Sequence, residues 1–413
     1  MTHLPVQLSD VIRARQALAG FVRGTPLYHS PSISSMVGCP VYLKPENLQR
    51  AGSFKVRGAF YKMSTLSPEE QRRGVVAASA GNHAQGVALA AQQAGIPATI
   101  VMPAEAPITK VQATEAYGAR VVLYGTTYDD AYDHALEIQR ATGATFIPAF
   151  DDPQIIAGQG TIGLEILDDL PDAGTVLVPV GGGGLISGIA LAIKSLRPDC
   201  RIVGVQAAGA PAVYLSRQQG QYCATDSVRT IADGIAIKRP GKLTWEYIQR
   251  YVDDIVVVGE EEIGLGILVL LERAKLVAEG AGAVGMAALL AGKVPNLKPP
   301  VVVVVSGGNI DPNILARIIE RGLVKAGRYV RISALVPDRP GGLQRLLAVV
   351  ARAGANVIDV YHERWLDRVT VGEVQIQLAI ETRSQQHVQE LLAALRQEGY
   401  DAQLIPRFRP EGD

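Results

Sequence analysis

Short apolar runs rich in β-branched residues recur along the first three quarters of the chain. Longer segments with helix-like periodicity separate them, such as "NHAQGVALAAQQAG" and "SGIALAIKSLRPD". Strands that are apolar throughout and alternate with helices indicate parallel sheets that are buried on both faces. The predicted strands are residues 75–79, 97–102, 120–124, 145–149, 175–180, 201–206, 254–259 and 301–306. The pattern therefore predicts an α/β region up to about residue 325, with enough strands for two sheets.

The pattern changes near "GLVKAGRYVR". From Arg328 on, the strands alternate polar and apolar residues, as in "RYVRISALVP" and "TVGEVQIQLAIET". Between them, "LQRLLAVVARAG" is a predicted helix with one apolar face, formed by Leu343, Leu346, Leu347 and Val350. The order is β-α-β-β-α-β, the ferredoxin-like plan, and half-polar strands predict a sheet with helices on one face only. We expect a separate α+β domain over residues 328–413.

Length and charge narrow the class of protein. A chain of 413 residues is too long for one compact core, so two or three domains are expected. The 40 basic and 40 acidic residues balance and form no block of like charge, which gives no support to a nucleic-acid or membrane surface.

The cysteines and the apolar segments bear on the cellular compartment. Cys39, Cys200 and Cys223 contain no CxxC pair, which indicates a reducing compartment. Residues 1–20 have no apolar signal core and predict an amphipathic helix, and the longest apolar runs are far too short to span a membrane. We expect a cytoplasmic protein.

Four consecutive glycines, Gly181 to Gly184, follow the predicted strand 175–180 and open a helix near Leu185. Glycines at such a junction let backbone N–H groups approach a ligand, and the helix N-terminus favours an anion, so we predict a phosphate site. Ile186 and Ser187 break the dinucleotide fingerprint, and no lysine follows as in a P-loop. A tight strand-to-helix turn is the alternative, although four glycines exceed what a turn requires.

Two further loops join a strand to the next element. In "ASAGNHAQG", Ser79, Asn82 and His83 are candidates to cap the following helix. Alternatively, N–H groups of this turn bind a small carboxylate while the Asn82 amide contacts a second ring. "SGGN" places Ser306 at the carboxyl edge of a strand, where ligands of open α/β sheets gather, or else forms an ordinary turn.

The stretch "SFKVRGAF" places Lys55 at the start of a predicted helix, with Ser53 as a candidate N-cap. An ammonium is disfavoured there by the positive partial charge of the first turn, whereas a neutral amine is tolerated. The alternative is an ordinary lysine with a solvated head group. The six histidines form no i, i+4 pair, and neither H-E-x-x-H nor G-x-S-x-G occurs, so we predict no metal site.

The order "SFKVRGA", "SAGNHAQG", "GGGGL", "SGGN" resembles the pyridoxal-phosphate-dependent fold type II enzymes, the tryptophan-synthase-β-like superfamily. The strings "ENLQRAGSFKVRGA", "TIADGIAIKRPG" and "EGAGAVG" resemble the threonine dehydratases (threonine ammonia-lyases) in particular, over about residues 5–325. The tail, with "DRPGGL", resembles an ACT domain. The resemblance implies two parallel-sheet, three-layer lobes within a catalytic region 1–325. The small lobe, about 48–150, would be inserted in the large lobe, 1–47 and 151–325, and an ACT-like domain would follow at 328–413.

The resemblance also implies a cofactor, pyridoxal 5′-phosphate, and a role for each motif. Lys55 would form a Schiff base with the cofactor aldehyde and then act as base at the substrate Cα, and Phe54 would shield it from water. Asn82 would contact the 3′ oxygen of the ring, and Ser306 would hydrogen-bond the pyridine nitrogen. The implied phosphate residues are Gly181, Gly182, Gly183, Gly184 and Leu185. The loop implied for the substrate carboxylate contains Ser79, Gly81, Asn82 and His83.

The implied reaction is β-elimination from L-threonine to give 2-oxobutanoate and ammonia, and also from L-serine to give pyruvate. The alternatives are a dehydratase for L-serine or another 3-hydroxy amino acid, and a catalytically dead amino-acid sensor. Ala80 stands where serine racemases need a serine, so racemisation is expected to be weak. Gln206 and Ala212 stand at the positions aligned to the acidic metal ligands of racemase-like relatives, so no metal is carried over.

The ACT-like tail implies a small-ligand site formed by Asp338, Arg339, Gly341, Gly342 and Leu343. A helix N-terminus there suits a carboxylate, and isoleucine or valine is the effector expected of a biosynthetic enzyme. The alternative is a surface used only for oligomerisation. The expected partners are an amino-acid substrate and further copies of the chain, as a homodimer or homotetramer, without nucleic acid or membrane.

Overall fold

The structure, a computed structural model, describes residues 4–364 and 370–405. Its contacts divide the chain into two compact units, Met1–Ile310 and Asp311–Asp413. The division falls earlier in the chain than the change of pattern at Arg328. The reason is that helix α14 (Pro312–Lys325) contacts strand β11 (Tyr329–Pro337) of the second unit.

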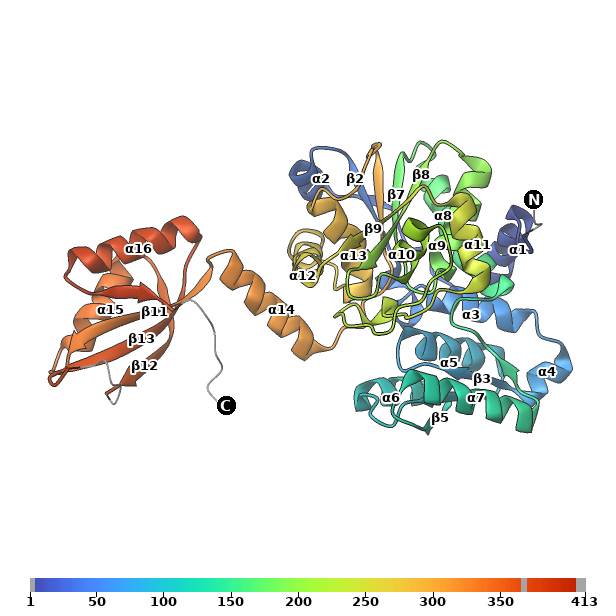
Figure 1. Cartoon of the computed structure of the whole chain (residues 1–413), viewed down its shortest axis with the longest axis horizontal. Helices are drawn as coiled ribbons and strands as arrows, with labels where there is room; N and C mark the ends of the chain where they lie inside the picture. The colour runs from blue at the N-terminus through green and yellow to red at the C-terminus, as the bar shows by residue number, and fades with distance from the viewer. Residues whose placement is uncertain (1–3, 365–369, 406–413) are drawn as a thin grey trace. The chain divides into compact units, whose positions relative to one another are not determined.

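The larger sheet of the first unit has six strands, and only the pair β1–β2 is antiparallel. The order is β1 (Tyr28–His29), β2 (Val41–Pro45), β10 (Val301–Val305), β7 (Thr175–Pro179), β8 (Arg201–Ala207), β9 (Asp254–Val258). Every residue of the central strands β7 and β10 is buried, as a sheet covered on both faces requires. In Figure 1, one face is covered by α8 (Pro153–Asp169), α9 (Gly184–Leu196) and α11 (Lys242–Tyr251), and the other by α12 (Glu260–Val269) and α13 (Gly280–Leu290).

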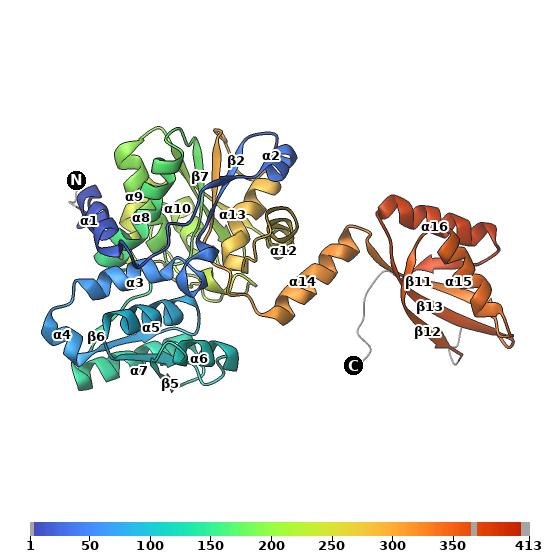
Figure 2. The same ribbon diagram turned by 180° about the vertical axis from the view of Figure 1, so that it is seen from behind.

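The smaller sheet has four parallel strands in the order β5 (Arg120–Leu123), β4 (Ala98–Met102), β3 (Val75–Ala78), β6 (Thr145–Phe146). Successive side chains of a strand point to opposite faces of the sheet, and the side chains of β3 are buried on both faces. Val75 and Ala77 pack with α5 (Asn82–Ala94), whereas Val76 and Ala78 pack with α7 (Tyr128–Thr142). Figure 2 shows these two helices on either side of the sheet.

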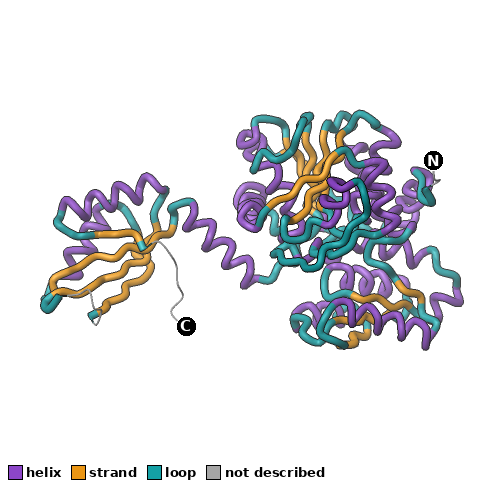
Figure 3. Tube along the Cα trace, viewed as in Figure 1, coloured by secondary structure: helices purple, strands orange, loops and turns teal. Residues whose placement is uncertain are grey.

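All eight predicted strands form (Figure 3), but the one at 145–149 ends at Phe146. Pro148 lacks an N–H and cannot continue a ladder. Strands β1 and β2 were not predicted. The amphipathic segment at the N-terminus forms α1 (Leu8–Leu18), and residues 1–3 of that prediction lie outside the described residues. The other helices of this unit are α2 (Pro31–Val37), α3 (Lys55–Ser64), α4 (Pro68–Arg73), α6 (Ile108–Glu115), α10 (Ala212–Gln219) and the short η1 (Glu46–Leu48), η2 (Arg50–Gly52), η3 (Asp233–Ile235) and η4 (Leu270–Ala274).

The second unit has the predicted β-α-β-β-α-β order after α14. Its elements are β11, α15 (Gly342–Arg352), β12 (Asn356–Glu363), β13 (Glu373–Glu381), α16 (Gln385–Gln397) and β14 (Ala402–Leu404). The strands form an antiparallel sheet in the order β12-β13-β11-β14. Alternate residues of β11 are buried and share one core with α15 and α16, while the residues between them are partly exposed. Both helices therefore cover the same face, as the half-polar strands predicted.

Among the described helices of both units, none combines the length and the apolar character needed to cross a bilayer.

Candidate active site

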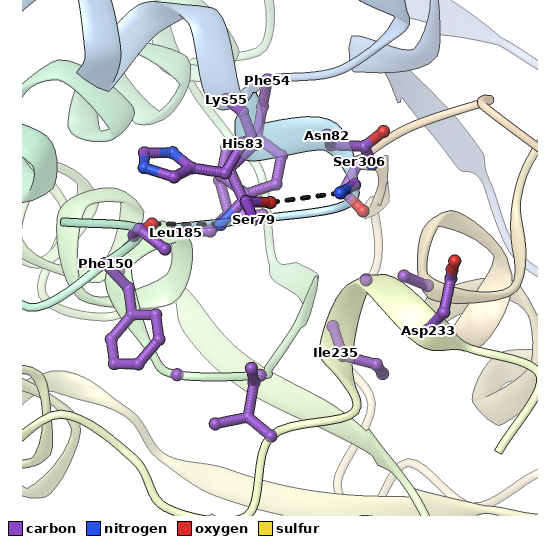
Figure 4. Close-up of a pocket in the computed structure, with 18 of the residues that line it drawn as sticks. Phe54, Lys55, Ser79, Asn82, His83, Phe150, Leu185, Asp233, Ile235 and Ser306 are labelled. Carbon is purple, nitrogen blue, oxygen red and sulfur yellow. Dashed lines mark hydrogen bonds between the residues drawn. The ribbon is translucent and has the colours of Figure 1, made fainter. Parts of the chain in front are cut away.

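A cavity of about 350 Å³ opens in the first unit, where the carboxyl ends of β3, β7 and β10 meet the start of α3. Its volume falls in the range of about 300–1,000 Å³ that is usual for small-molecule sites. Every residue predicted to contact cofactor or substrate lines it: Phe54, Lys55, Ser79, Gly81, Asn82, His83, Gly181, Gly182, Gly183, Gly184, Leu185 and Ser306. Figure 4 shows side chains from these separate loops around one space.

Helix α3 begins at Lys55, but Ser53 does not cap it. The N-cap position is Phe54, without a side-chain bond, and the Ser53 hydroxyl is buried with no partner in the described part of the chain. Ser53 is instead extended and bridges Gly307. The N-cap prediction is therefore wrong, because this pairing holds Ser53 against the loop after β10. The Phe54 N–H donates to the Ser306 carbonyl at 3.1 Å, so the lysine and serine loops are bonded directly.

The Lys55 amine faces the cavity. Its Nζ donates to the Ala149 carbonyl at 3.0 Å and lies 5.2 Å from the centroid of the Phe54 ring. Burial lowers the pKa of Lys55 to about 8, against the charge of Glu279, which raises it. A larger share of this amine is therefore neutral at physiological pH than in a solvated lysine, and burial is the main cause.

The glycine loop presents consecutive backbone donors to the cavity. The N–H groups from Gly181 to Leu185 have no acceptor among the described residues. A Cβ on Gly182 would lie 2.3 Å from the Phe150 ring, and Gly183 has φ +99°. The loop needs glycines because Phe150 packs against it and the backbone turns left-handed. Free N–H groups at the start of α9 fit a phosphate.

Thr244 fixes this loop on the side away from the cavity, and no sequence motif indicated it. Its Oγ1 donates to the Gly182 carbonyl at 2.6 Å, and the Gly241 N–H donates to the same oxygen at 3.1 Å. In a trans peptide the C=O and N–H point in opposite directions, so these bonds turn the Gly183 N–H away from Thr244. Asp151 fixes Thr244 in turn, by accepting its backbone N–H at 3.1 Å.

The loop after β3 offers a second set of donors. None of the three candidate side chains caps α5, whose N-cap is Gly81, and the Ser79 Oγ accepts the Gly81 N–H at 3.1 Å. Within the described residues, the N–H groups of Ala80, Asn82 and His83 have no acceptor, which fits a carboxylate.

His83 is buried, and its ring is already engaged. Its Nε2 lies 2.9 Å from the Ile147 carbonyl, which can only accept, so this nitrogen carries the proton. Burial and the Lys55 charge lower the pKa of His83 to about 3, so the ring is neutral. His83 therefore has its backbone N–H, rather than its imidazole Nε2, available to a ligand.

Two cavity residues that the sequence did not indicate surround Asn82. Its Nδ2 donates to Glu279 Oε1 at 2.6 Å, and its Oδ1 accepts from Asn309 Nδ2 at 2.9 Å. Burial raises the pKa of Glu279 to about 7, and the Asp233 charge adds to the effect. The signal that could have found Glu279 is its place as the one acid, at the start of the otherwise apolar string "EGAGAVG". Ser306, directly after β10, is 3% exposed, and its hydroxyl has no partner within the described chain.

Two of the positions that the sequence analysis compared with serine racemases and their relatives are Ala80 and Gln206. Ala80 lines the cavity. Gln206 is buried and satisfied, since its Nε2 donates to the Val180 carbonyl at 3.2 Å and its Oε1 accepts the Tyr214 N–H at 2.8 Å. Over residues 4–364 and 370–405, no three His, Cys, Asp or Glu side chains are grouped as metal ligands.

The predicted effector residues lie in the second unit, at the turn from β11 into α15. Gly341 is the left-handed N-cap of α15, with φ 83°, and Asp338 pairs with Arg364 at 2.9 Å. The N–H groups of Asp338, Arg339 and Gly342 bond to carbonyls of the second unit. The backbone donors left for a ligand are therefore those of Gly341 and Leu343.

A model of the family described as "Pyridoxal-phosphate dependent enzyme" matches residues 18–307. The chain belongs to this family. The predicted cofactor is therefore confirmed, and the donors around the cavity are those that a phosphorylated pyridine needs.

Relatives in this family refine the comparison. The L-threonine ammonia-lyase of Thermotoga maritima is 52% identical over 400 residues, which is 97% of this chain and 100% of the relative. A structure of maize serine racemase has a TM-score of 0.73 and 36% identity, over 78% of this chain and 98% of that one. A structure of threonine deaminase isoform 2 from Solanum lycopersicum has a TM-score of 0.71 and 39% identity, over 77% of this chain and 91% of that one. These likenesses confirm the predicted fold type II for the first unit.

Proposed function

We propose that the protein is a threonine ammonia-lyase, which converts L-threonine into 2-oxobutanoate and ammonia and acts also on L-serine. The observation that carries this proposal is one cavity that joins the Lys55 amine, the free N–H groups of residues 181–185, Asn82 and Ser306. The relatives named as threonine ammonia-lyase and threonine deaminase support the choice of substrate.

The cavity residues divide between the cofactor and the substrate. Lys55 would hold the cofactor covalently, the loop Gly181–Leu185 its phosphate, Asn82 its 3′ oxygen and Ser306 its pyridine nitrogen. When bound, the cofactor supplies an electron sink for negative charge at the substrate Cα. Phe54 and Phe150 line the same cavity and would limit the access of water.

The protein's own part in the reaction is to bind the substrate and to move one proton. The N–H groups of Ala80, Asn82 and His83 would hold the substrate carboxylate, which fixes the amino acid in the cavity. Lys55, with its pKa lowered to about 8, would take the proton from Cα once the substrate amine has released it. A base is most effective when its pKa lies close to the working pH.

Racemisation is a second activity that the likeness to maize serine racemase raises. A racemase needs a proton donor on the face opposite the lysine, and Ala80 supplies no hydroxyl there. We therefore expect elimination to dominate strongly over racemisation. A dehydratase with a preference for L-serine or a bulkier 3-hydroxy acid remains the alternative within the family.

We propose further that residues 328–413 form an ACT-like regulatory domain in a cytoplasmic homodimer or homotetramer. The β-α-β-β-α-β order of the second unit supports it. The T. maritima relative matches 97% of this chain, so the match includes most of this unit. The effector would be isoleucine or valine, as for a biosynthetic enzyme, bound at Asp338–Leu343.

The test is a threonine-dependent 2-oxobutanoate assay, repeated with isoleucine and with valine. Values of kcat/KM for threonine, serine and bulkier 3-hydroxy acids separate the substrate alternatives. The loaded protein should absorb visible light, and borohydride should fix the cofactor on Lys55. A protein that stays colourless with added pyridoxal 5′-phosphate would overturn the proposal.

Lys55→Ala should leave a folded protein without covalent cofactor. Because Lys55 supplies both the attachment and the base, turnover should fall by at least about 10³-fold. Mass spectrometry after borohydride treatment and the 2-oxobutanoate assay measure the two losses. Lys62→Ala, on the same helix but outside the lining of the cavity, is the matched control. It should keep both the covalent cofactor and the turnover.

A further inference from the structure

Glu279 is a buried acid at the wall of the cavity, and the proposed mechanism gives it no task. It stands at the N-cap position of α13 and is 4% exposed. Its backbone N–H donates to the Gly307 carbonyl at 3.1 Å, which fixes the start of the side chain. A Cβ on Gly307 would lie 2.4 Å from Glu279 Oε1 and 3.1 Å from Asn82 Nδ2, so the glycine leaves room for the bond between these two side chains.

The hydrogen bonds around Asn82 admit one orientation of its amide. Asn309 Nδ2 lies 2.8 Å from the Ala51 carbonyl, which can only accept, so this atom of Asn309 is the donor nitrogen. The same nitrogen lies 2.9 Å from Asn82 and therefore faces its oxygen. Asn82 Nδ2 then points to Glu279 and donates one of its two protons there, at 2.6 Å.

The second proton of Asn82 Nδ2 is left for a ligand. An amide nitrogen carries two N–H groups, and the described residues take up only one of them. If the amide turned over, its oxygen would face both the carboxylate of Glu279 and the ring oxygen of the cofactor. With the Glu279 carboxyl group ionised, both contacts would then be repulsive, so the orientation of Asn82 decides whether it attracts the cofactor.

We propose that Glu279 is a positioning residue that, together with Asn309, locks the Asn82 amide with an N–H directed at the ring oxygen of the cofactor. The inference rests on the proposed contact between Asn82 and the 3′ oxygen. Glu279 acts as a fixed acceptor on the far side of the amide nitrogen. Asn309 acts as a fixed donor on the amide oxygen, and Gly307 provides the space for the pair.

Two substitutions of similar volume separate hydrogen bonding from packing. Glu279→Gln keeps an acceptor for Asn82, whereas Glu279→Met fills the same space without one. The measured quantity is the apparent dissociation constant of pyridoxal 5′-phosphate from the apoenzyme, followed by visible absorbance. Loss of one buried hydrogen bond should weaken binding about tenfold in Glu279→Met. Glu279→Gln should stay within about threefold of the wild type.

A double-mutant cycle with Asn82→Ala tests whether Glu279 acts through Asn82. Once the Asn82 amide is gone, Glu279→Met should cause no further loss of affinity. Thermal unfolding of each apoenzyme shows that the variants are folded. Wild-type protein that takes up the cofactor, and Lys55→Ala that does not hold it covalently, establish the site independently of these variants.

Three results would overturn the inference. Glu279→Met could bind the cofactor as tightly as the wild type, or the losses in the double variant could add. Alternatively, Glu279→Gln could lose as much affinity as Glu279→Met, in which case the carboxylate charge matters and the amide orientation does not.

Discussion

The role proposed for Ser306 is to select among reactions that share a cofactor. Its hydroxyl is neutral, buried and placed at the end of β10 on the cavity wall. A neutral hydroxyl cannot keep a pyridine nitrogen protonated as a carboxylate can. Negative charge at Cα is then less delocalised, which favours loss of a β-substituent over transamination.

Ser306→Asp should therefore lower the rate of 2-oxobutanoate formation by about tenfold or more, since it alters the electron sink itself. The measurement is kcat for threonine in protein loaded with cofactor, with the bound cofactor quantified by absorbance. Ser306→Thr keeps a hydroxyl and is the control. An elimination rate in Ser306→Asp equal to that of the wild type would refute the proposed role.

His83 and Glu279 make opposite contributions to stability as the pH changes. Burial lowers the pKa of His83 from 6.5 to about 3. Between these values only the unfolded chain binds the proton, so the contribution of His83 is complete above pH 6.5 and declines as the pH falls. Burial raises the pKa of Glu279 from 4.5 to about 7, so its contribution is complete below pH 4.5 and is lost as the pH rises.

His83→Gln should make the apoenzyme less sensitive to acid. Between pH 6.5 and 4.5 its free energy of unfolding should fall less steeply with decreasing pH than that of the wild type. The two slopes should differ by about 1.4 kcal/mol per pH unit. Urea unfolding at several pH values measures the slope. Glu279→Gln should change the slope in the opposite direction, and equal slopes in all three proteins would contradict the assignment.

At the scale of elements, helix α3 is fixed by a buried network of charges. Arg57, two residues after Lys55, is fully buried and contacts both oxygens of Glu46 at 2.8 Å. It also bonds Glu165 of α8 at 2.5 Å, and Lys44 of β2 contacts the same carboxylate at 2.5 Å. The network therefore ties the start of α3 to the larger sheet and to α8.

Arg57→Met should destabilise the protein by about 3–5 kcal/mol, because it leaves Glu46 fully buried without a cation and removes one of the two cations that contact Glu165. Urea unfolding measures the loss. Arg73→Met breaks the exposed pair with Glu69, whose side chains are 44% and 69% exposed, and should cost about 0–0.5 kcal/mol. A loss for Arg57→Met as small as that for Arg73→Met would contradict this role.

The same network shows where prediction from sequence succeeds and fails. The strands with uninterrupted apolar runs were predictable because burial on both faces leaves a direct mark on composition. Strand β2, "VYLKP", was missed because Lys44 looks like a surface residue until Glu165, distant in sequence, is placed beside it. Ser53 was misjudged for a similar reason, since its bridge to Gly307 overrides its preference as a cap.

The residues of the site that belong to short sequence motifs could be predicted. Lys55, Asn82, the glycines and Ser306 follow strands or open helices, and their order along the chain resembles that of known enzymes. Thr244, Asn309 and Glu279 act through contacts with residues 62, 227 and 197 positions away. No local pattern encodes such distant pairs, so only the folded structure brings them to the cavity.

At the scale of the whole molecule, the two units have separate cores. The apolar residues of β11, α15, β13 and α16 form one core within the second unit. The apolar clusters around the two parallel sheets lie in the first unit and contain none of these residues. All the cofactor and substrate residues proposed here belong to the first unit. Catalysis and regulation are therefore expected to be separable.

A chain that ends at Lys325 should form 2-oxobutanoate from threonine, with kcat within about threefold of the full chain, but should not respond to isoleucine or valine. Leu343→Asp in the full chain is the matched test, because it places a carboxylate beside the donors proposed for the effector. Initial rates with and without each amino acid measure the response. An unaltered response in the shortened chain would place the effector site in the first unit.

The direct bond between the Phe54 N–H and the Ser306 carbonyl has a consequence for motion. It joins the start of α3 to the end of β10, so the Lys55 amine and the Ser306 hydroxyl, both proposed to contact the cofactor, are tied to each other. The loop 79–83 follows β3 and belongs to the smaller sheet. A change in the angle between the two sheets would therefore strain the bonds of Asn82 to Glu279 and Asn309, while the spacing between Lys55 and Ser306 stays constant. Of the proposed cofactor contacts, that of Asn82 is the one that such a motion would loosen first.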